Sequence, residues 1–329
     1  MNLFTKTSEA GTMGGKRGFI MYHIIINPAS RSGRGLKIWK KQIEPALRER
    51  KISYRSYFSN APGEIADITA QIFSLHPEGL LRLIILGGDG TVNEALSGMR
   101  ELSRVVLGYI PTGSSNDLAR ALKLPKNPLD ALDLILKGAN AASLDLGCIT
   151  YADGKKRLFA VSCGVGFDAA VCREALHSPM KTVLNKLGLG KLTYLVIALK
   201  QLFAAKKVSC QLSFEDRPPV HIQRLLFVTC MIHPYEGGGF MFCPGADAQD
   251  GLLSLCAVGD IPKLLVLFAL PTAFWGRHYF AKGIEAYQAA SLQIQTTSPL
   301  WVHTDGEVTQ KSCSFSVSCL PKALRLIVP

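Results

Sequence analysis

The sequence is poor in acidic residues relative to basic ones. Aspartate and glutamate number 25 against 37 lysines and arginines, which gives a formal net charge of +12. This imbalance excludes an acidic protein and indicates attraction to something negative, such as nucleic acid, an anionic lipid surface or a phosphate-rich substrate. Charge alone does not choose among the three.

Paired metal-binding cysteines are also lacking. The nine cysteines include no Cys-x-x-Cys, which argues against a zinc knuckle, and nine is an odd number. Most lie in apolar runs, as Cys163 does in Val161–Gly164. They are therefore expected to be buried thiols in a reducing compartment.

Long hydrophobic runs are absent. The longest, Leu264 to Trp275, is too short to span a bilayer and is broken by Pro271. The start of the chain is polar, without the apolar core of a signal peptide, so residues 1–19 are expected to be a disordered tail. These features predict a cytoplasmic protein with no membrane-spanning segment.

The remaining composition is that of a globular protein with two domains. The chain has 329 residues, 48% of them hydrophobic and 19% charged. After Ala141 the sequence pattern changes to short β-like runs separated by turns. We therefore predict one domain at 20–143 and a second at 144–329. The last strand of the second domain could pack back on the first domain.

The first domain shows strands alternating with helices. Strands are expected at 22–26, 52–58, 82–86 and 105–110, with amphipathic helical segments after them. This order predicts a doubly wound parallel sheet, in which ligands bind beyond the carboxyl ends of the strands. Four loops would then face one crevice: 27–35, 59–63, 87–91 and 111–117.

The second domain reads as an antiparallel β-sandwich. Short β-like runs separated by turns are expected at 158–163, 208–214, 225–231, 252–258, 292–296 and 315–320. A helix interrupts them, with an apolar stripe formed by Leu192, Leu195, Val196, Leu199, Leu202 and Phe203. Lysines lie on or beside the same segment, at 181, 186, 191, 200, 206 and 207. A helix docked on the sandwich with solvated lysines is preferred over a membrane-contacting face by about two to one.

Two glycine loops carry the strongest functional signal. Gly87–Gly90 places three glycines between a strand and a helix, where backbone amides can converge on a phosphate. Asp89 would repel that phosphate unless a cation, such as Mg²⁺, lay between them. The loop at 111–120 brings further hydroxyls, Asp117 and Arg120 to the next strand end, although a simple helix cap explains Asp117 as well.

Two familiar nucleotide motifs fail on inspection. Gly188–Thr193 resembles a Walker loop, but Asn185 replaces its first glycine and Leu192 its hydroxyl residue. Gly164-Val-Gly-Phe-Asp168 lacks the third glycine of a dinucleotide fingerprint, and a close-packed backbone crossing is the better interpretation.

Two acidic turns occur in the second domain. Asp247 and Asp250 are three residues apart and can share a hard cation with a backbone carbonyl, although an Asp-Gly turn without metal is the simpler reading. Asp305 and Glu307 flank Gly306 between apolar strands, which suits a general base if the turn faces the crevice.

Taken together, the motifs resemble the diacylglycerol kinase family, most closely its soluble bacterial members. The resemblance runs in order from about residue 20 to the end, through the segments 87–94, 111–120, 163–168, 237–251 and 305–307. It implies phosphorylation of a lipid hydroxyl that depends on ATP and Mg²⁺, in a cleft between an α/β domain and a β-sandwich. It implies a lipid alcohol and an anionic membrane surface, met peripherally, as partners, and no nucleic acid.

The resemblance also implies roles for individual residues. ATP contacts would come from Asn27, Pro28, Ala29, Ser30, Arg31, Arg34, Ser59, Gly88, Asp89, Gly90, Thr91, Val92, Asn93, Glu94 and Ser114. Asp117 and Arg120 would join the active-site network, and Asp89 would act through Mg²⁺ together with Asp145. Asp305 or Glu307 would be the base, and a separate structural Mg²⁺ would use Asp247, Asp250 and the Leu252 carbonyl. The length of the first loop leaves the choice between Arg31 and Arg34 open.

Two rival functions are weighed against a lipid kinase. A nicotinamide-dinucleotide kinase shares the glycine-aspartate loop but resembles this chain poorly beyond residue 110. A non-catalytic lipid-binding regulator ranks lower, because every required acid is present. The lipid substrate and the oligomeric state, including a homodimer, stay open.

Overall fold

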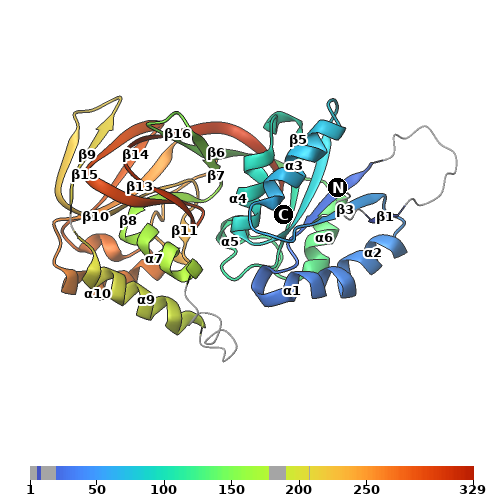
Figure 1. The fold of residues 1–329 in the computed structure, drawn as a ribbon, viewed down its shortest axis with the longest axis horizontal. Helices are drawn as coiled ribbons and strands as arrows, with labels where there is room; N and C mark the ends of the chain where they lie inside the picture. Colours follow the sequence, from blue (N-terminus) through green and yellow to red (C-terminus); the bar gives the residue numbers. More distant parts are fainter. Residues whose placement is uncertain (1–5, 9–19, 178–189, 207) are drawn as a thin grey trace. The chain divides into compact units, whose positions relative to one another are not determined.

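The computed structural model describes residues 6–8, 20–177, 190–206 and 208–329 (Figure 1). The chain forms two compact units. Unit 1 comprises Met1–Asp145 and Lys322–Pro329, and unit 2 comprises Leu146–Pro321. The end of the chain thus belongs to the same unit as its beginning.

Unit 1 alternates strands with helices. Its strands are β1 (Lys6–Ser8), β2 (Tyr22–Ile26), β3 (Tyr54–Phe58), β4 (Leu81–Gly87) and β5 (Val105–Pro111). Its helices are α1 (Ser30–Ile38), η1 (Trp39–Ile43), α2 (Glu44–Glu49), α3 (Glu64–Leu75), α4 (Asp89–Gly98), η2 (Leu102–Arg104), α5 (Asp117–Ala121) and α6 (Pro128–Lys137).

The sheet of unit 1 is parallel at its centre. The order β3-β2-β4-β5 runs with all four strands parallel, and the end of β16 (Glu307–Ile327) joins β5 in parallel through Arg325 and Leu326. Near-continuous burial of β2 and β4 explains their apolar, β-branched sequences, since parallel strands are covered on both faces. The prediction of a doubly wound α/β domain is confirmed.

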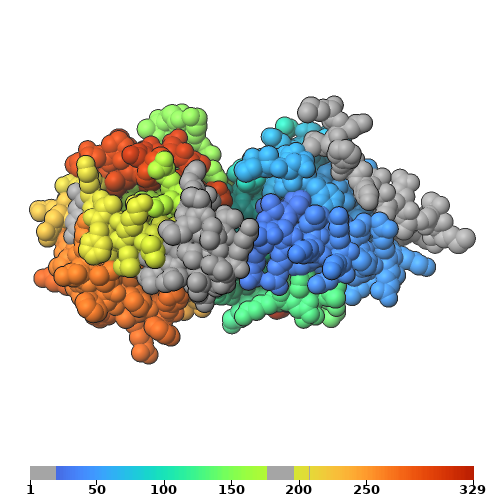
Figure 2. Space-filling view, turned by 60° about the horizontal axis from the view of Figure 1, so that its bottom comes forward, coloured from blue at the N-terminus to red at the C-terminus, as the bar shows by residue number. Residues whose placement is uncertain are grey.

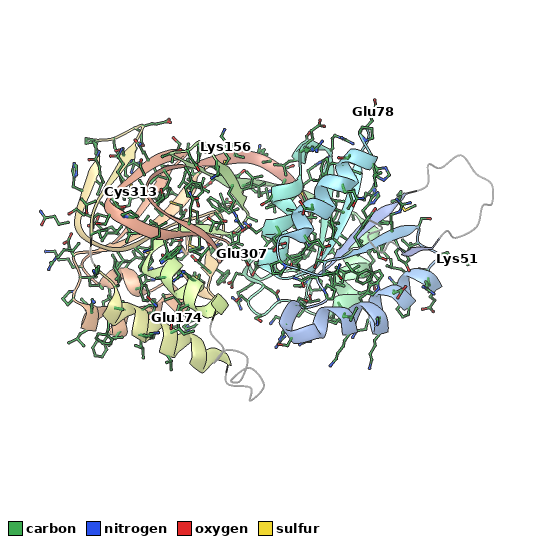
Figure 3. All side chains as sticks on the ribbon, viewed as in Figure 1. Lys51, Glu78, Lys156, Glu174, Glu307 and Cys313 are labelled. Carbon is green, nitrogen blue, oxygen red and sulfur yellow. The ribbon has the colours of Figure 1, made fainter. Side chains whose placement is uncertain are left out.

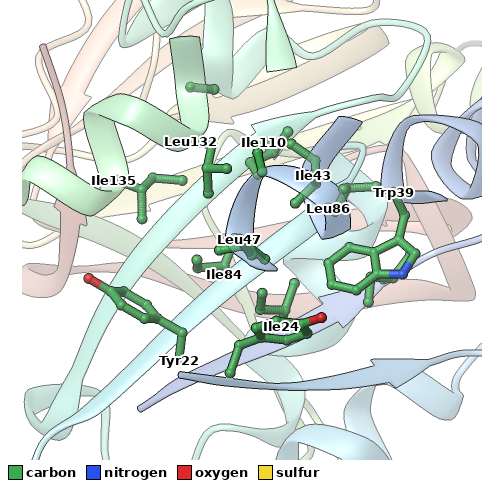
Figure 4. Packing of buried hydrophobic residues seen from close by; sticks show 14 of the residues in the cluster. Tyr22, Ile24, Trp39, Ile43, Leu47, Ile84, Leu86, Ile110, Leu132 and Ile135 are labelled. Atoms are coloured by element: carbon green, nitrogen blue, oxygen red, sulfur yellow. The ribbon is translucent and has the colours of Figure 1, made fainter. Parts of the chain in front are cut away.

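One face of this sheet carries a well-packed apolar cluster (Figure 4). Trp39, Ile43 and Leu47, from the run of helices after the first loop, pack with Leu132 and Ile135 of α6. Their partners on the sheet are Tyr22, Ile24, Ile26, Ile84, Leu86 and Ile110. The helices α3 and α4 pack together on the other side of the sheet (Figure 1).

Unit 2 is built mainly from strands. They are β6 (Ala141–Tyr151), β7 (Lys156–Phe159), β8 (Ser162–Gly166), β9 (Val208–Phe214), β10 (Val220–Met231), β11 (Tyr235–Glu236), β12 (Phe240–Met241), β13 (Leu253–Gly259), β14 (Ile284–Ala289), β15 (Ser291–Thr304) and most of β16. Its helices are α7 (Phe167–His177), α9 (Gly190–Ala204), α10 (Lys263–Thr272), η3 (Ala273–Trp275) and η4 (His278–Phe280).

Two long strands connect the layers of this antiparallel sandwich. The first part of β10 pairs with β9 and the second part pairs with β8. Likewise, the first part of β15 pairs with β9 and its last residues pair with β8. Register shifts between Ile222 and Leu225 and between Gln295 and Leu300 lie where the partner changes. Such bulges bend a strand, which lets it leave one layer for the next.

Three details differ from the sequence-based expectation. Within the tail expected to be disordered, Lys6–Ser8 form β1, paired antiparallel with β3, and the other residues of 1–19 lie outside the described part. The run expected at 158–163 is divided between β7 and β8. The apolar stripe of α9 is also split, because Val196 and Phe203 are exposed while Leu202 is buried.

The reason for the split stripe is that Ile197, which the expected stripe did not include, supplies the buried face together with Leu202. The side chains of Leu192 and Leu195, and Lys181, Lys186 and Lys207, lie outside the described residues, as do most of the residues of the Walker-like motif. Lys200 bonds to Glu174 of α7, 2.6 Å away, which ties α9 to its neighbour.

The cysteines fit the expectation of buried thiols. All nine are free, seven are buried, Cys172 is half-buried and Cys313 is exposed. Among the described helices, none has the length and apolar character needed to cross a bilayer.

Candidate active site

The loops that follow the strands of unit 1 meet through side-chain hydrogen bonds. Asn27 Nδ2, at the end of β2, donates to Thr91 Oγ1 of α4 at 3.1 Å. Ser30 Oγ lies 2.8 Å from Thr112 Oγ1, which follows β5. Gly63 N, before α3, donates to Glu94 Oε2 at 3.1 Å. The expectation that the loops gather at one edge of the sheet is therefore met within unit 1.

The two glycine loops touch each other along their backbones. A Cβ on Gly113 would lie 2.5 Å from Gly88 Cα, and a side chain on Gly87 would overlap Thr91. The amides of Thr112 and Gly113 both donate to Gly87 O. The glycines thus serve close packing between loops as well as leaving backbone exposed for a ligand.

The helix after β4 begins at this contact. Gly88 N donates to Thr91 Oγ1 at 3.2 Å, while Thr91 N and Val92 N donate back to Gly88 O. Gly88, Asp89 and Gly90 are half-buried, so the start of α4 is accessible to a ligand. The amides of a helix N-terminus together with the helix dipole favour an anion there.

Three other members of this motif are structural. Thr91, Val92 and Asn93 are buried, the last two completely.

The first loop adopts an unusual backbone. Arg31, Ser32 and Gly33 have consecutive positive φ values of 46°, 58° and 88°. This left-handed run makes a tight turn, within which Gly33 N donates to Ala29 O at 3.3 Å. Arg31 and Arg34 are both exposed. The remaining residues of the expected set, Pro28, Ala29, Ser59 and Ser114, lie in or beside these loops.

Asp89 caps a neighbouring helix. Its Oδ2 accepts from Asp117 N at 2.8 Å and its Oδ1 from Leu118 N at 3.2 Å, at the start of α5. Burial, together with the nearby Asp89 and Asp117 carboxylates, raises the pKa of Tyr109 well above its usual value. Tyr109 was not foreseen from the sequence, where it is one more apolar residue of a strand.

The other two predicted site aspartates of unit 1, Asp117 and Asp145, also have partners within that unit. Asp117 is buried and forms an ion pair with Arg120 of the same helix. Asp145 is only 1% exposed, and its Oδ1 accepts from Lys322 N at 2.7 Å. Lys322 has a φ of 51°, so Asp145 holds a left-handed turn at the point where the chain re-enters unit 1.

In unit 2, the Asp305 carboxylate is surrounded by backbone amides. It accepts from the amides of Ala160, Val161 and Ser162 at 2.9, 2.7 and 3.0 Å, while its own amide donates to Ser162 O. Asp305 itself has a φ of 50°, which fits the turn before β16. Glu307 is half-buried at the first position of β16, where it is labelled in Figure 3.

The second acidic turn closes on itself. Asp247 Oδ1 accepts from Gln249 N at 3.0 Å and Asp250 Oδ1 from Leu252 N at 2.8 Å. Both acids are exposed. These are the hydrogen bonds of ordinary Asx turns, so the turn is explained without a metal, and a structural Mg²⁺ there stays a prediction.

One cluster was not assembled from the sequence. His303 Nε2 lies 3.2 Å from Asp168 Oδ2 and 3.0 Å from Glu236 Oε1, and His303 is completely buried. Asp168 and His303 lie in recognised motifs, but Glu236 carries no local signal, because only the folding of β11 brings it to the other two.

Two family models match this chain, one over its first part and one over its second. Residues 21–149 match the family model described as the diacylglycerol kinase catalytic domain. Residues 161–328 match the model described as the YegS C-terminal NAD kinase β-sandwich-like domain. The chain belongs to the diacylglycerol kinase catalytic-domain family. It is a kinase of the lipid kinase class that includes the diacylglycerol kinases.

Relatives cover nearly the whole chain. A Bacillus subtilis (strain 168) protein named YtlR, described as a candidate lipid kinase, is 28% identical over 312 residues, which are 93% of this chain and 98% of the relative. A diacylglycerol kinase of Mycobacterium tuberculosis is 27% identical over 270 residues, covering 81% of this chain and 83% of the relative. The crystal structure of a candidate diacylglycerol kinase from Bacillus anthracis shares the fold, with a TM-score of 0.71, 21% identity and coverage of 95% and 99%.

Proposed function

We propose that this kinase transfers the γ-phosphoryl group of ATP to a lipid hydroxyl, with diacylglycerol as the acceptor and phosphatidic acid as the product. The observation that carries the proposal is the meeting of the glycine loops at the start of α4. There the backbone is accessible, and side chains at Gly87 and Gly113 would be obstructed. Phosphoryl transfer depends mainly on alignment and charge neutralisation, which such a loop cluster supplies.

The nucleotide phosphates would lie against the amides at the start of α4 and the left-handed turn at Arg31–Gly33. Arg31 and Arg34 are exposed beside that turn and add positive charge. Asp117 fixes Arg120 through their ion pair, which keeps a guanidinium near the second glycine loop. These features support ATP as the co-substrate.

Mg²⁺ would neutralise charge on the transferring group when bound. Asp89 fits this role in part, because it is half-buried at the start of α4, next to the amides that would face the phosphates. Asp145 fits less well as a direct ligand, since it is almost fully buried and holds the Lys322 turn. We therefore assign Asp89 to direct metal contact and Asp145 to a supporting position.

Glu307 is the better candidate for the base. Three backbone amides surround the Asp305 carboxylate, and hydrogen bonds of this kind stabilise the ionised form, which weakens it as a proton acceptor. Glu307 follows two residues later and is partly accessible. Asp305 would then position the turn, and Glu307 would take the proton of the lipid hydroxyl late in the attack.

The experiment is transfer of labelled phosphate from ATP to a mixed lipid extract, with the product identified by mass. Labelled phosphatidic acid would support the proposal, and another labelled lipid would change the acceptor while keeping the reaction class. Transfer to nicotinamide dinucleotide would favour the rival kinase. Absence of transfer to any acceptor would favour the non-catalytic lipid-binding regulator.

Two variants separate the roles of the acids. Glu307→Gln is expected to lower turnover on the order of 10²- to 10⁴-fold without affecting the melting temperature, as for loss of a general base. Asp305→Asn is expected to lower stability by about 1–3 kcal/mol, because it leaves buried amides poorly paired. Full turnover in Glu307→Gln would transfer the base role back to Asp305.

We also propose a peripheral contact with a membrane, through the segment 263–275. Val266, Ala269 and Ala273 are buried on one side of this helical segment, whereas Leu264, Phe268 and Trp275 are exposed on the opposite side. Phe268 is 73% exposed and Trp275 is 70% exposed. We call Leu264, Phe268 and Trp275 the apolar ridge.

The surroundings of the apolar ridge favour an anionic lipid surface as its partner. Arg277 and Lys282 are exposed just after it, and the whole chain carries a net charge of +12. Lys263 Nζ donates to Phe203 O and Ala205 O, which ties α10 to the end of α9. Figure 2 shows these two regions, orange and yellow, on one face. Aromatic side chains with nearby basic groups are typical of interfacial binding.

A further inference from the structure

The buried cluster of Asp168, Glu236 and His303 has more negative charge than its protons can satisfy. Gly306 N donates to His303 Nδ1 at 3.2 Å, so Nδ1 acts as an acceptor and the imidazole proton lies on Nε2. That single proton faces two carboxylate oxygens, at 3.2 and 3.0 Å. One N–H cannot serve both oxygens, and a buried charge without a partner is costly.

The other oxygens of the two acids are already bonded. Asp168 Oδ1 accepts from Ala169 N at 2.7 Å, and Glu236 Oε2 accepts from Thr229 Oγ1 at 3.1 Å. These bonds fix both carboxylates, so that the remaining oxygen of each points at His303 Nε2.

The backbone at Gly164 lies directly against two of the ligand atoms. A side chain on Gly164 would overlap both Asp168 Oδ2 and His303 Nε2. Gly164 pairs with Thr229 on one side and with His303 on the other, so the position without a side chain lies within the cluster. Two residues earlier on the same sheet face, Ser162 Oγ is fully buried and has no hydrogen-bond partner among the described residues.

The distances match a coordination sphere. The three ligand atoms lie within 4.8 Å of one another, and no other described residues of these types form such a group. Zn²⁺ bonds of about 2.0–2.1 Å in tetrahedral geometry separate ligand atoms by about 3.3 Å, close to the two spacings at His303 Nε2. An imidazole with two carboxylates suits a divalent transition metal better than Mg²⁺, which prefers oxygen ligands and keeps its waters.

We propose that Asp168, Glu236 and His303 form a binding site for a divalent transition metal ion of the zinc type. The ion replaces the proton on His303 Nε2 and takes one oxygen from each carboxylate, which leaves a fourth position for water. It links α7, β11 and the end of β15 inside unit 2. Since Asp305 and Glu307 follow His303 by two and four residues, the ion would hold their turn in place.

The test uses the full chain stripped of metal with a chelator. Zn²⁺ is titrated in competition with a chromophoric chelator, and Co²⁺ is used as a spectroscopic probe. We expect one tight equivalent of Zn²⁺, and Co²⁺ bands of a tetrahedral site without thiolate charge transfer. Asp168→Asn, Glu236→Gln and His303→Gln should each weaken Zn²⁺ binding by at least about 100-fold, the upper range seen even for indirect partners of a metal.

A control distinguishes this site from the free thiols. His278 is also a buried histidine of unit 2, and its Nε2 lies 3.6 Å from Cys256 Sγ. His278→Gln should leave Zn²⁺ binding unchanged. The proposal is overturned if the wild-type chain binds no Zn²⁺ equivalent, if the three cluster variants bind as well as wild type, or if Co²⁺ shows thiolate bands. The Co²⁺ spectrum of the wild-type chain decides the matter even where a variant does not fold.

Discussion

Asp89 combines a structural contact with the catalytic role that we propose for it. Its two oxygens accept the first amides of α5, which lack partners within that short helix. The sequence places Asp89 in a phosphate loop, where a negative charge is unexpected. The structure gives it a second task, because it links the first glycine loop to the helix that follows the second.

This dual role predicts a mixed defect for Asp89→Asn. The amide keeps one acceptor but presents N–H groups to a backbone donor, so stability should fall by about 1–2 kcal/mol. Turnover should fall much further, and more Mg²⁺ should not restore it. Melting curves and phosphate transfer at increasing Mg²⁺ measure the two effects.

Asn127→Ala is the matched control at this scale. Asn127 Oδ1 accepts from Leu129 N at 3.0 Å and caps α6, outside the strand-end loops. It should lose similar stability, about 1 kcal/mol, and keep its turnover. If the two variants lost turnover equally, the effect of Asp89→Asn would be one of folding alone.

At the scale of elements, α10 with η3 stands out as a helical segment that is apolar on opposite sides. A helix that is hydrophobic all round is ordinarily buried, yet one side of this segment is exposed. Burial of Val266, Ala269 and Ala273 explains its attachment to unit 2. The apolar ridge has no such explanation within the described residues, and a lipid surface supplies one.

Replacing the apolar ridge should separate membrane binding from stability. Phe268→Ser and Trp275→Ser remove side chains that are mostly exposed, so the melting temperature should change little. Binding to vesicles containing anionic lipid should weaken by about tenfold or more per residue, because each ring buries apolar area in the interface. Vesicle sedimentation at low and high salt measures this.

The control is Leu75→Ser at the end of α3 in unit 1, an exposed apolar residue outside the ridge. It should bind vesicles as wild type does. Binding that is insensitive to the ridge variants would contradict the proposal, and loss of a dimer in those variants would assign the ridge to self-association instead.

At the scale of the whole molecule, each unit contains a buried neutral histidine. Burial, followed by the neighbouring His76 and Arg55 charges, lowers the pKa of His23 in unit 1 to about 4. Burial lowers the pKa of His233 in unit 2 to about 4 against the opposing effect of Asp247. Both are below the ordinary histidine value of about 6.5.

These shifts predict acid sensitivity of both units. Between pH 6.5 and 4 these histidines are protonated in the unfolded chain but stay neutral in the folded protein. The free energy of unfolding therefore falls as the pH is lowered through this window. The loss is on the order of 3 kcal/mol for each histidine. Denaturant unfolding from pH 7 to 4 measures it, and His233→Gln should flatten the dependence if it folds. A stability that stays constant over this range would contradict the assignment.

Much of the architecture follows from local pattern. The alternation of apolar strands with amphipathic helices specified the parallel sheet, and the β-like runs specified most strands of the sandwich, because periodicity reports which face is buried. The glycine loops at the strand ends were likewise visible, since only glycine fits where Gly113 approaches Gly88. The sequence by itself therefore determined the family, the fold and the position of the glycine loops.

Only the tertiary structure decided what the acids do. Asp89, Asp145 and Asp305 are the same type of residue in the sequence. In the structure, each accepts a hydrogen bond from the backbone of a distant segment. The partnership of Asp168, Glu236 and His303 joins residues from α7, β11 and β15. Spacing along the chain cannot reveal such contacts, because the charge state and the ligand preference of a carboxylate depend on the donors and the burial that folding brings to it.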